Sequence, residues 1–466
     1  MTAPWDRRSD KERERAEDLV LRSWLPAVAD FSPYWGERVR GIGLGATDFR
    51  DREALLRLAP VRELDVQRAG GDGAPALLMR PTIEQVKTRA TGSVLSTFLA
   101  AIRREGTDGA RHALLTEYKP IHVHRGGAAN DLAVAYSRSD LDRLHRCGAR
   151  AASVLGLNDS DYLVSAIPAG PTLDFFGVYH LALGSSMLAL HPRGHGDPLE
   201  RVVESFALIP TTVVAVHPGE AVELAGVLAD ADANVARVDT IVLVGPPPAV
   251  GVRDTIRDAW VEAGASASSL KVRSLFAPSE GRAMWAEDAE GGLVTYPDLE
   301  VLEVIDPVTL ESTDGAGELV ITSAGWHGTA LLRYRTGVYV EGIDADGGDG
   351  RTVPRLVGRV QVRAWQPTVT GSKGDQHVLD VRGVATAAES LPIESWRAEL
   401  RGPTSRIKSD RFMVELAGEL SEEQVVAATE EIATQTGVWP AKVVAVDPSV
   451  VATKISEDGS AFVDLR

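Results

Sequence analysis

The sequence predicts an α/β fold: a large N-terminal body of parallel-rich sheets with helices on both faces, followed by a small α+β lid domain of the ferredoxin-like type. Between residues 160 and 245, short apolar runs such as DYLVSAIP and TTVVAVHP alternate with helical patterns. This alternation is typical of parallel strands that are covered on both faces. Beyond residue 359 a new pattern begins, in which SWRAELRG and RFMVELAG flank a helical segment. We therefore place one domain at 1–358 and a second at 359–466.

Composition limits the class of protein. The chain has 466 residues, 44% apolar and 25% charged, which suits a soluble globular protein with two or three cores. A formal charge of -17 disfavours phosphate backbones and anionic membranes, so we expect neither nucleic acid nor a membrane as partner. The charged N-terminus and the lack of a long apolar run predict a cytoplasmic protein. Cys147 is the only cysteine, which excludes an intrachain disulfide.

The first part of the chain predicts helices and then a strand pair. Residues 1–30 have the pattern of an amphipathic helix, and the aromatic residues that follow in FSPYWGERV are packing residues or, alternatively, ligand-stacking ones. PIHV and LAVAY are strand candidates on either side of HRGGAAND, and Ser139 is the predicted N-cap of the next helix. A Gly-rich turn can present backbone amides to an anion, and Arg125 adds a positive charge. A loop without a ligand is the alternative.

Several motifs occur in one order along the second half of the body. Residues 317–337, GELVITSAGWHGTALLRYRTG, predict a strand, a loop and a strand. FAPSE lies upstream at 276–280, and VPRLVGR lies downstream. Together with YSRSDL at 136–141, this order resembles the phenylacetate-CoA ligase branch of the adenylate-forming enzymes. The resemblance implies that ATP and magnesium activate a small carboxylic acid, with an aromatic acid as one candidate, for transfer to a thiol such as CoA.

The resemblance also implies roles for individual residues. FAPSE stands at the place of an aromatic residue that stacks on adenine, a hydroxyl that contacts phosphate and a glutamate that holds magnesium. The resemblance places His180 in the region of the acyl pocket, and the alternative is that it is a core residue. The implied residues are Gly126, Gly245, Phe276, Ser279, Arg335, Val338 and Arg359 for the nucleotide, Glu280 for the metal, Glu280 and Lys454 for catalysis, and Phe176, Tyr179 and His180 for the substrate pocket.

The sequence departs from this family at the nucleotide site. Val338 stands where an aspartate holds the ribose, and a valine offers no acceptor. Gly127 and Ala128 replace two threonines of the phosphate loop. The family lysine near the C-terminus aligns with Asp458, and Lys454 lies four residues earlier.

We therefore expect a ligase with an altered nucleotide site that binds ATP weakly or not at all. The alternative is a catalytically degenerate homologue that binds an acyl or aromatic ligand, or a partner enzyme. A third hypothesis, acyl transfer without ATP, lacks a nucleophile motif. Asp346 and Asp349 replace the cysteine pair of some relatives, so we expect no zinc. These two carboxylates are calcium ligands or, alternatively, part of a solvated turn.

Overall fold

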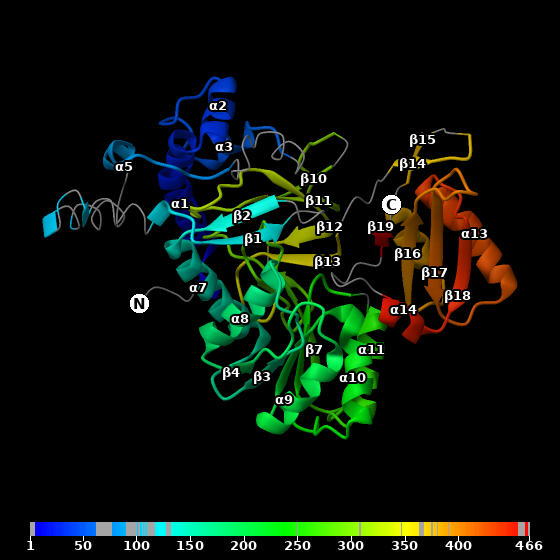
Figure 1. Ribbon diagram of the computed structural model, residues 1–466. Helices are drawn as coiled ribbons and strands as arrows, with labels where there is room; N and C mark the ends of the chain where they lie inside the picture. Colours follow the sequence, from blue (N-terminus) through cyan, green and yellow to red (C-terminus); the bar gives the residue numbers. More distant parts are fainter. Residues whose placement is uncertain are drawn as a thin grey trace.

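The computed structural model shows a large body of sheets and helices with a smaller sheet-and-helix unit beside it (Figure 1). The fold class is therefore the mixed α/β fold that the sequence predicts. None of the helices in the described ranges is long and apolar enough to cross a membrane. The structure describes residues 5–61, 77–89, 100, 103–104, 106, 108–109, 117–126, 132–248, 250–306, 309–345, 347–362, 368–373, 376–379, 381–389, 391–454 and 462–464.

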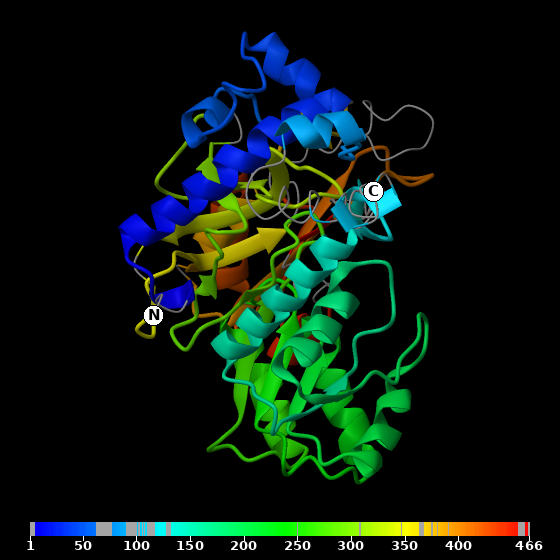
Figure 2. The same ribbon diagram turned by 90° about the vertical axis from the view of Figure 1, so that its left-hand side faces the viewer.

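A six-stranded sheet forms the lower part of the body (Figures 1 and 2). Its strands run in the order β4-β3-β5-β6-β7-β8, and all neighbours are parallel except β7 and β8. This order confirms the parallel sheet predicted from residues 160–245. The strands are β3 (Tyr162–Ser165), β4 (Leu188–Leu190), β5 (Val213–Val216), β6 (Thr240–Val244), β7 (Lys271–Phe276) and β8 (Trp285–Ala286).

Helices cover both faces of this sheet because its central strands are apolar on both sides. In β5, Val213 and Ala215 belong to one apolar cluster and Val214 and Val216 to another, as the two-residue period of a strand requires. One face is covered by α7 (Arg138–Leu155) and α8 (Leu173–Ser185). The other is covered by η2 (Leu199–Val202), α9 (Val203–Leu208), α10 (Ala221–Asp230) and α11 (Val250–Glu262), with η3 (Pro218–Glu220) leading into α10.

A second sheet of the body is antiparallel, in the order β10-β11-β12-β13-β9. The predicted strand, loop and strand of residues 317–337 appear as β11, a loop and the start of β12, although β12 begins only at Tyr334. The strands are β9 (Leu293–Val294), β10 (Val301–Ile305), β11 (Gly317–Thr322), β12 (Tyr334–Asp344) and β13 (Arg355–Val362), and the predicted pair β1 (His122–Gly126) and β2 (Leu132–Tyr136) forms a separate ribbon.

The N-terminal helices pack on the body. Phe31 and Trp35 are buried, and the Trp35 indole donates a hydrogen bond to the Ala330 carbonyl oxygen at 2.9 Å, so these two aromatic residues are packing residues. Cys147 is buried on α7. The elements are η1 (Trp5–Arg7), α1 (Asp10–Phe31), α2 (Pro33–Gly41), α3 (Arg52–Leu56) and α5 (Ile83–Arg89).

The C-terminal unit has its own apolar core and a mixed sheet in the order β18-β17-β16-β19. Arg359 lies inside β13, which continues to Val362, so the domain boundary at residue 359 stays a prediction. The elements are β14 (Thr368–Thr370), β15 (Gln376–Val378), α12 (Arg382–Glu389), β16 (Ser395–Arg401), β17 (Arg411–Ala417), α13 (Glu422–Thr436), β18 (Lys442–Val446), α14 (Pro448–Lys454) and β19 (Phe462–Asp464).

Candidate functional site

The turn after β7 carries two of the predicted site residues. Ser279 and Glu280 are both 6% exposed, and the turn is closed by the backbone N–H of Gly281, which donates to the Pro278 carbonyl at 3.0 Å. Gly126, the last residue of β1, lies against this turn. A Cβ on Gly126 would stand 3.0 Å from Glu280 Oε2, so a glycine allows this close approach. The structure thus brings together Gly126, Ser279 and Glu280.

Hydrogen bonds fix this turn to three neighbouring elements. The Leu173 backbone N–H at the start of α8 donates to Ser279 Oγ at 2.9 Å. The Tyr136 hydroxyl of β2 donates to the Ser279 carbonyl at 3.4 Å, and the Ser323 hydroxyl donates to the Glu280 carbonyl at 3.1 Å. Ser279 Oγ therefore serves as an acceptor for α8 while it keeps its own proton to donate.

Three further nucleotide candidates lie on strands β7 and β12. The Phe276 ring packs against Trp285, with centroids 5.7 Å apart, in the same apolar cluster as Val338, which is 2% exposed. Arg335 binds Glu318, with Nε 2.8 Å from Oε2. The roles of Phe276, Val338 and Arg335 at a nucleotide stay predictions.

Other candidates are placed by their backbone alone or lie outside the described residues. Gly245 follows β6 with φ of 139°, in the region that favours glycine, and its N–H donates to Leu275 O at 3.0 Å. The Arg359 side chain lies outside the part of the chain that the structure describes. The same holds for the phosphate-loop residues Gly127 and Ala128, and for Asp346 and Asp458.

Lys454 is the last residue of α14, and its side chain is 46% exposed. Its Nζ lies 2.7 Å from Glu415 Oε1 on β17. The structure therefore pairs this lysine with the sheet of the C-terminal unit, and its predicted catalytic role stays a prediction.

The predicted substrate residues lie on α8 within a chain of aromatic rings. The Phe176 ring lies 4.6 Å from His122 and 4.8 Å from His124, measured between centroids. Tyr179 is 41% exposed and lies beside His180. The sequence reasoning missed His122 and His124, although their spacing of two in β1 places them on one face of a strand.

The histidines of this ring cluster are neutral at pH 7. Burial, together with the nearby imidazoles of His122 and His180, lowers the pKa of His124 to about 3. Burial and neighbouring imidazoles lower the pKa of His180 to about 4, and burial lowers that of His122 as well. An uncharged aromatic surface of this kind suits an apolar or aromatic group better than a charged one.

Two glycines allow α7 and α8 to cross closely and so set the position of Phe176. A Cβ on Gly148 would lie 2.1 Å from the His180 carbonyl oxygen, and a Cβ on Gly184 would lie 2.4 Å from the Ala149 nitrogen. The α8 backbone is therefore seated directly on α7.

Gly148→Ala is expected to push α8 away from α7 and to lower the free energy of unfolding by about 1–3 kcal/mol, as overpacking does. Urea denaturation measures this loss. Gly226→Ala on α10 is the matched control, because nothing lies within 4 Å of its Cβ position. There the helix should gain up to about 1 kcal/mol. Equal effects of the two variants would contradict the close crossing.

A chain of charged groups lies at the carboxyl ends of β3 and β5. Arg193 binds both oxygens of Glu220, at 2.9 and 3.0 Å, and donates to the Ala166 carbonyl at 2.6 Å. His217 is buried, with Nδ1 3.7 Å from Glu220 Oε2 and Nε2 3.7 Å from Asp174 Oδ2. Burial alone would lower the pKa of His217, but the two carboxylates outweigh burial and raise the pKa to about 9.

His217 is expected to make stability depend on pH. Its folded-state pKa of about 9 exceeds the ordinary value of 6.5, so the stability it contributes is complete below pH 6.5 and is lost as the pH rises through 9. Urea denaturation of the wild type and of His217→Asn should therefore differ more at pH 6 than at pH 10. His195→Asn serves as the control, because His195 is exposed on the surface. A difference that grows with pH would contradict this ion-pair assignment.

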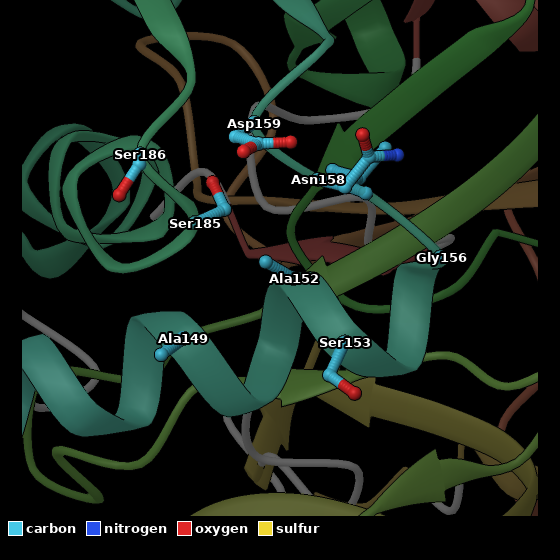
Figure 3. A pocket seen from close by; sticks show the side chains of 9 residues that line it. Ala149, Ala152, Ser153, Gly156, Asn158, Asp159, Ser185 and Ser186 are labelled. Carbon is cyan, nitrogen blue, oxygen red and sulfur yellow. The ribbon is translucent and has the colours of Figure 1, made fainter.

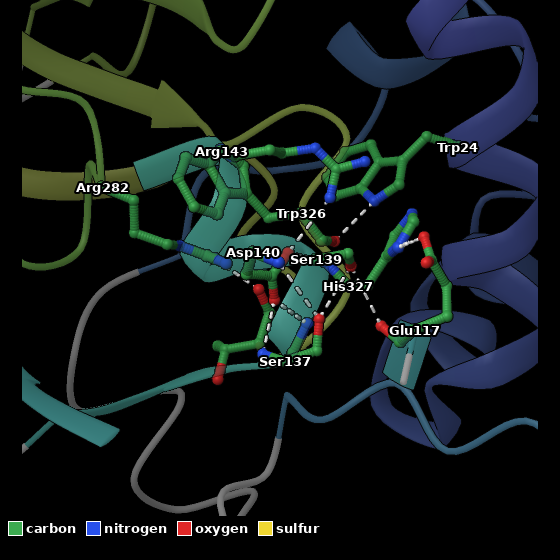
Figure 4. Close-up of polar contacts among 11 residues, drawn as sticks. Trp24, Glu117, Ser137, Ser139, Asp140, Arg143, Arg282, Trp326 and His327 are labelled. Carbon is green, nitrogen blue, oxygen red and sulfur yellow. Dashed lines mark hydrogen bonds and ion pairs between the residues drawn. The ribbon is translucent and has the colours of Figure 1, made fainter. Parts of the chain in front are cut away.

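Asp140 fixes the loop between β11 and β12 to the start of α7 (Figure 4). Its carboxylate accepts from the backbone N–H groups of Ser137 at 2.9 Å, His327 at 2.9 Å and Gly328 at 2.7 Å. The Ser137 hydroxyl accepts from the Asp140 N–H, which completes a capping box. The N-cap is therefore Ser137, and the prediction of Ser139 is wrong by two residues because Asp140 at the third helical position reaches back to Ser137.

Arg282 connects the same loop to the Glu280 turn. It is fully buried, its Nη2 donates to the Thr329 carbonyl, and its Cζ lies 5.2 Å from the Trp326 ring centroid. Its φ of 59° lies in the left-handed region, which is unusual for a residue with a side chain.

A shallow pocket of about 530 Å³ lies between the C-terminal ends of α7 and α8 (Figure 3). Its lining is small or polar, and it includes Ser153, Asn158 and Asp159. The Glu280 turn contacts the opposite end of α8, which is about 20 Å away along the helix axis. This pocket is therefore separate from the candidate site.

Glu280 is the carboxylate predicted to hold a metal ion at the candidate site. In the described ranges, no three His, Cys, Asp or Glu side chains gather so that they could hold a metal ion. Magnesium at a nucleotide site is held by one or two carboxylates plus phosphates, and Glu280 fits that arrangement. Val338 does not fit a ribose, because its side chain has no polar atom.

The comparisons with known proteins place the fold. No family model and no curated protein matches the chain. A solved structure of 2-hydroxyisobutyryl-CoA ligase in the postadenylation state has a TM-score of 0.69 and 18% identity, covering 99% of this chain and 91% of that one. Its open conformation with 2-HIB-AMP and CoA has a TM-score of 0.65 and 19% identity, covering 95% and 90%. The thioesterification state has a TM-score of 0.59 and 18% identity, covering 99% and 91%.

The likeness to these structures extends over both the body and the C-terminal unit, and at this level of identity it defines the fold. The chain therefore has the fold of the adenylate-forming CoA ligases.

Proposed function

We propose that the chain is an acyl or aryl adenylate-forming ligase with an altered nucleotide site, similar to phenylacetate-CoA ligase. It activates a small carboxylic acid with ATP and transfers the acyl group to a thiol such as CoA. The observation that carries this proposal is the buried Glu280 carboxylate beside Gly126, at the carboxyl end of a parallel strand. Ligands of open α/β sheets bind at this edge.

The Glu280 turn supplies the groups for the phosphate end of the nucleotide. Glu280 would hold the magnesium ion, which when bound neutralises phosphate charge. Ser279 has a proton to donate, and the Leu173 N–H keeps its oxygen in place. The hydrogen bond from Ser323 to the Glu280 carbonyl keeps the turn in position.

The ring cluster on α8 and β1 supplies the surface for the acid. Phe176 and His122 are partly exposed, and their rings lie in contact. Because the imidazole is neutral, it needs no negatively charged group on the ligand. An apolar or aromatic acyl group matches these faces. An aromatic acid is therefore part of the proposal, and CoA as the thiol acceptor rests on the family resemblance.

The test is release of pyrophosphate with ATP, magnesium and a panel of aliphatic and aromatic acids. The wild type should respond to at least one acid at a low rate, and Glu280→Gln should reduce that rate by at least about 100-fold, as losses of electrostatic stabilisation do. Glu262→Gln, at the exposed end of α11, is the control and should be unchanged. An unchanged rate in Glu280→Gln would exclude Glu280 as the metal ligand.

A second candidate function is a catalytically degenerate homologue that binds an acyl or aromatic ligand, or a partner enzyme. The buried Val338 and the pairing of Lys454 with Glu415 favour it. Calorimetry with the same acids and their CoA thioesters separates the two. Saturable binding of an acid without any release of pyrophosphate supports the binding protein over the ligase.

A further inference from the structure

The helix α14 belongs to the C-terminal unit by sequence but packs on the body. It follows β18 directly and contacts β16 and β17 of that unit as well as η3 of the body. It also contacts α10 and α11 of the body (Figure 1). Val451, in the middle of α14, is 0% exposed. Its side chain belongs to the apolar cluster of the body that includes Leu224 of α10 and Ile256 of α11. Val451 of the C-terminal unit is therefore part of the apolar core of the body.

A backbone contact lies beside this anchor. Gly251 is in the first turn of α11, and a Cβ there would lie 2.2 Å from the carbonyl oxygen of Glu394, which precedes β16. Ala417, at the end of β17, is buried in the same cluster as Val451. A glycine at 251 is thus what lets the two backbones meet, because any side chain would separate them.

We propose that α14 is a lock that holds the C-terminal unit in one orientation on the body. Val451 is the buried side chain that anchors it, and Gly251 leaves room for the close approach of the Glu394 carbonyl. Interfaces between domains of one chain allow motion unless they are large and hydrophobic. Val451 and Ala417 give this one a buried apolar contact. Turning the C-terminal unit away would expose Val451 and Ala417 to water. Lys454 ends the same helix and is held with it.

The lock limits which arrangements the C-terminal unit can take relative to the body that carries the candidate site. The similar 2-hydroxyisobutyryl-CoA ligase has been solved in a postadenylation state, an open conformation and a thioesterification state. In this chain, leaving the present arrangement means withdrawing Val451 from a buried position. The lock stands on the packing of α14 alone, so it holds whether or not the chain proves to be a ligase.

Thiol labelling of Val451→Cys in the full chain measures opening directly. Cysteine is close to valine in size, and the native Cys147 reacts slowly because burial raises its pKa to about 12. Val426→Cys is the exposed control, because Val426 is 60% exposed on α13 of the same unit. We expect Val451→Cys to label at least about 100-fold more slowly than Val426→Cys, as a locally closed site does. Equal rates would overturn the lock.

Gly251→Ala combined with Val451→Cys tests the close approach of the Glu394 carbonyl to Gly251. The new methyl group should speed labelling at position 451 by about tenfold or more, since it forces the Glu394 carbonyl away. Gly226→Ala, where a Cβ meets nothing within 4 Å, should leave the rate unchanged. Labelling of Cys147 reports global unfolding in the same sample. If Gly251→Ala has no effect at position 451, or if it speeds labelling of Cys147 by the same factor, the contact at Gly251 does not hold the two units together and the proposal fails.

Discussion

Asp140→Ala is expected to lower the free energy of unfolding by about 3–5 kcal/mol, the range for removing one partner from a buried charged network. The Asp140 carboxylate is fully buried and accepts three backbone N–H groups, two of them from the loop at His327 and Gly328. Without it, those buried donors lose their acceptor, which costs the desolvation penalty of each unpaired N–H group. Arg143 loses its ion-pair partner as well. Urea denaturation with a fixed m-value measures the loss.

Asp142→Ala is the matched control for this prediction. Asp142 lies two residues further along α7 and is exposed, so its replacement should change stability by no more than about 0.5 kcal/mol. Asp140→Asn should fall between the two, since an amide keeps one acceptor oxygen and loses the charge. If Asp140→Ala and Asp142→Ala were equally mild, the loop would not depend on Asp140.

Val338→Asp is expected to bind ATP more tightly than the wild type and to be less stable without it. An aspartate would restore two charge-assisted hydrogen bonds to the ribose, each about 1.5–3 kcal/mol, so the gain is at most about 3–6 kcal/mol. In the absence of nucleotide, the carboxylate would be buried in an apolar cluster with Phe276 and Val340, which costs stability. The melting temperature should therefore fall, and ATP with magnesium should raise it more than in the wild type.

Val340→Asp separates the two parts of that prediction. Val340 is buried two residues further along β12 in the same cluster, so an aspartate there should lower the melting temperature similarly. It should not be rescued by ATP, because the family resemblance assigns no ribose contact to that position. Rescue of both variants would indicate nonspecific stabilisation by nucleotide, and rescue of neither would show that position 338 does not face the ribose.

The sequence predicted the parts of the fold that depend on local pattern. The parallel sheet follows from apolar strands such as β5, whose residues face two cores in alternation. The meeting of Gly126 with Glu280 was predicted only through the resemblance, because 154 residues of chain separate them.

Other contacts had no local signal. The pairing of Lys454 with Glu415 joins a helix end to a distant strand, and neither residue is marked by its neighbours in sequence. His124 was missed because its partner Phe176 comes from another element, and only the fold brings the two rings together. The anchor Val451 has the same origin, since one apolar residue in a short helix does not reveal which core it completes.

Calorimetric titration of the wild type with ATP and magnesium tests the central claim, that the nucleotide site is altered. The lost ribose contact and the two hydroxyls lost at Gly127 and Ala128 sum to roughly 4–9 kcal/mol before any new contact or bridging water is counted. Each 1.4 kcal/mol is about tenfold in affinity, so no saturation should appear at concentrations below the millimolar range. Saturable binding in the micromolar range would contradict the account and indicate an ordinary ligase site.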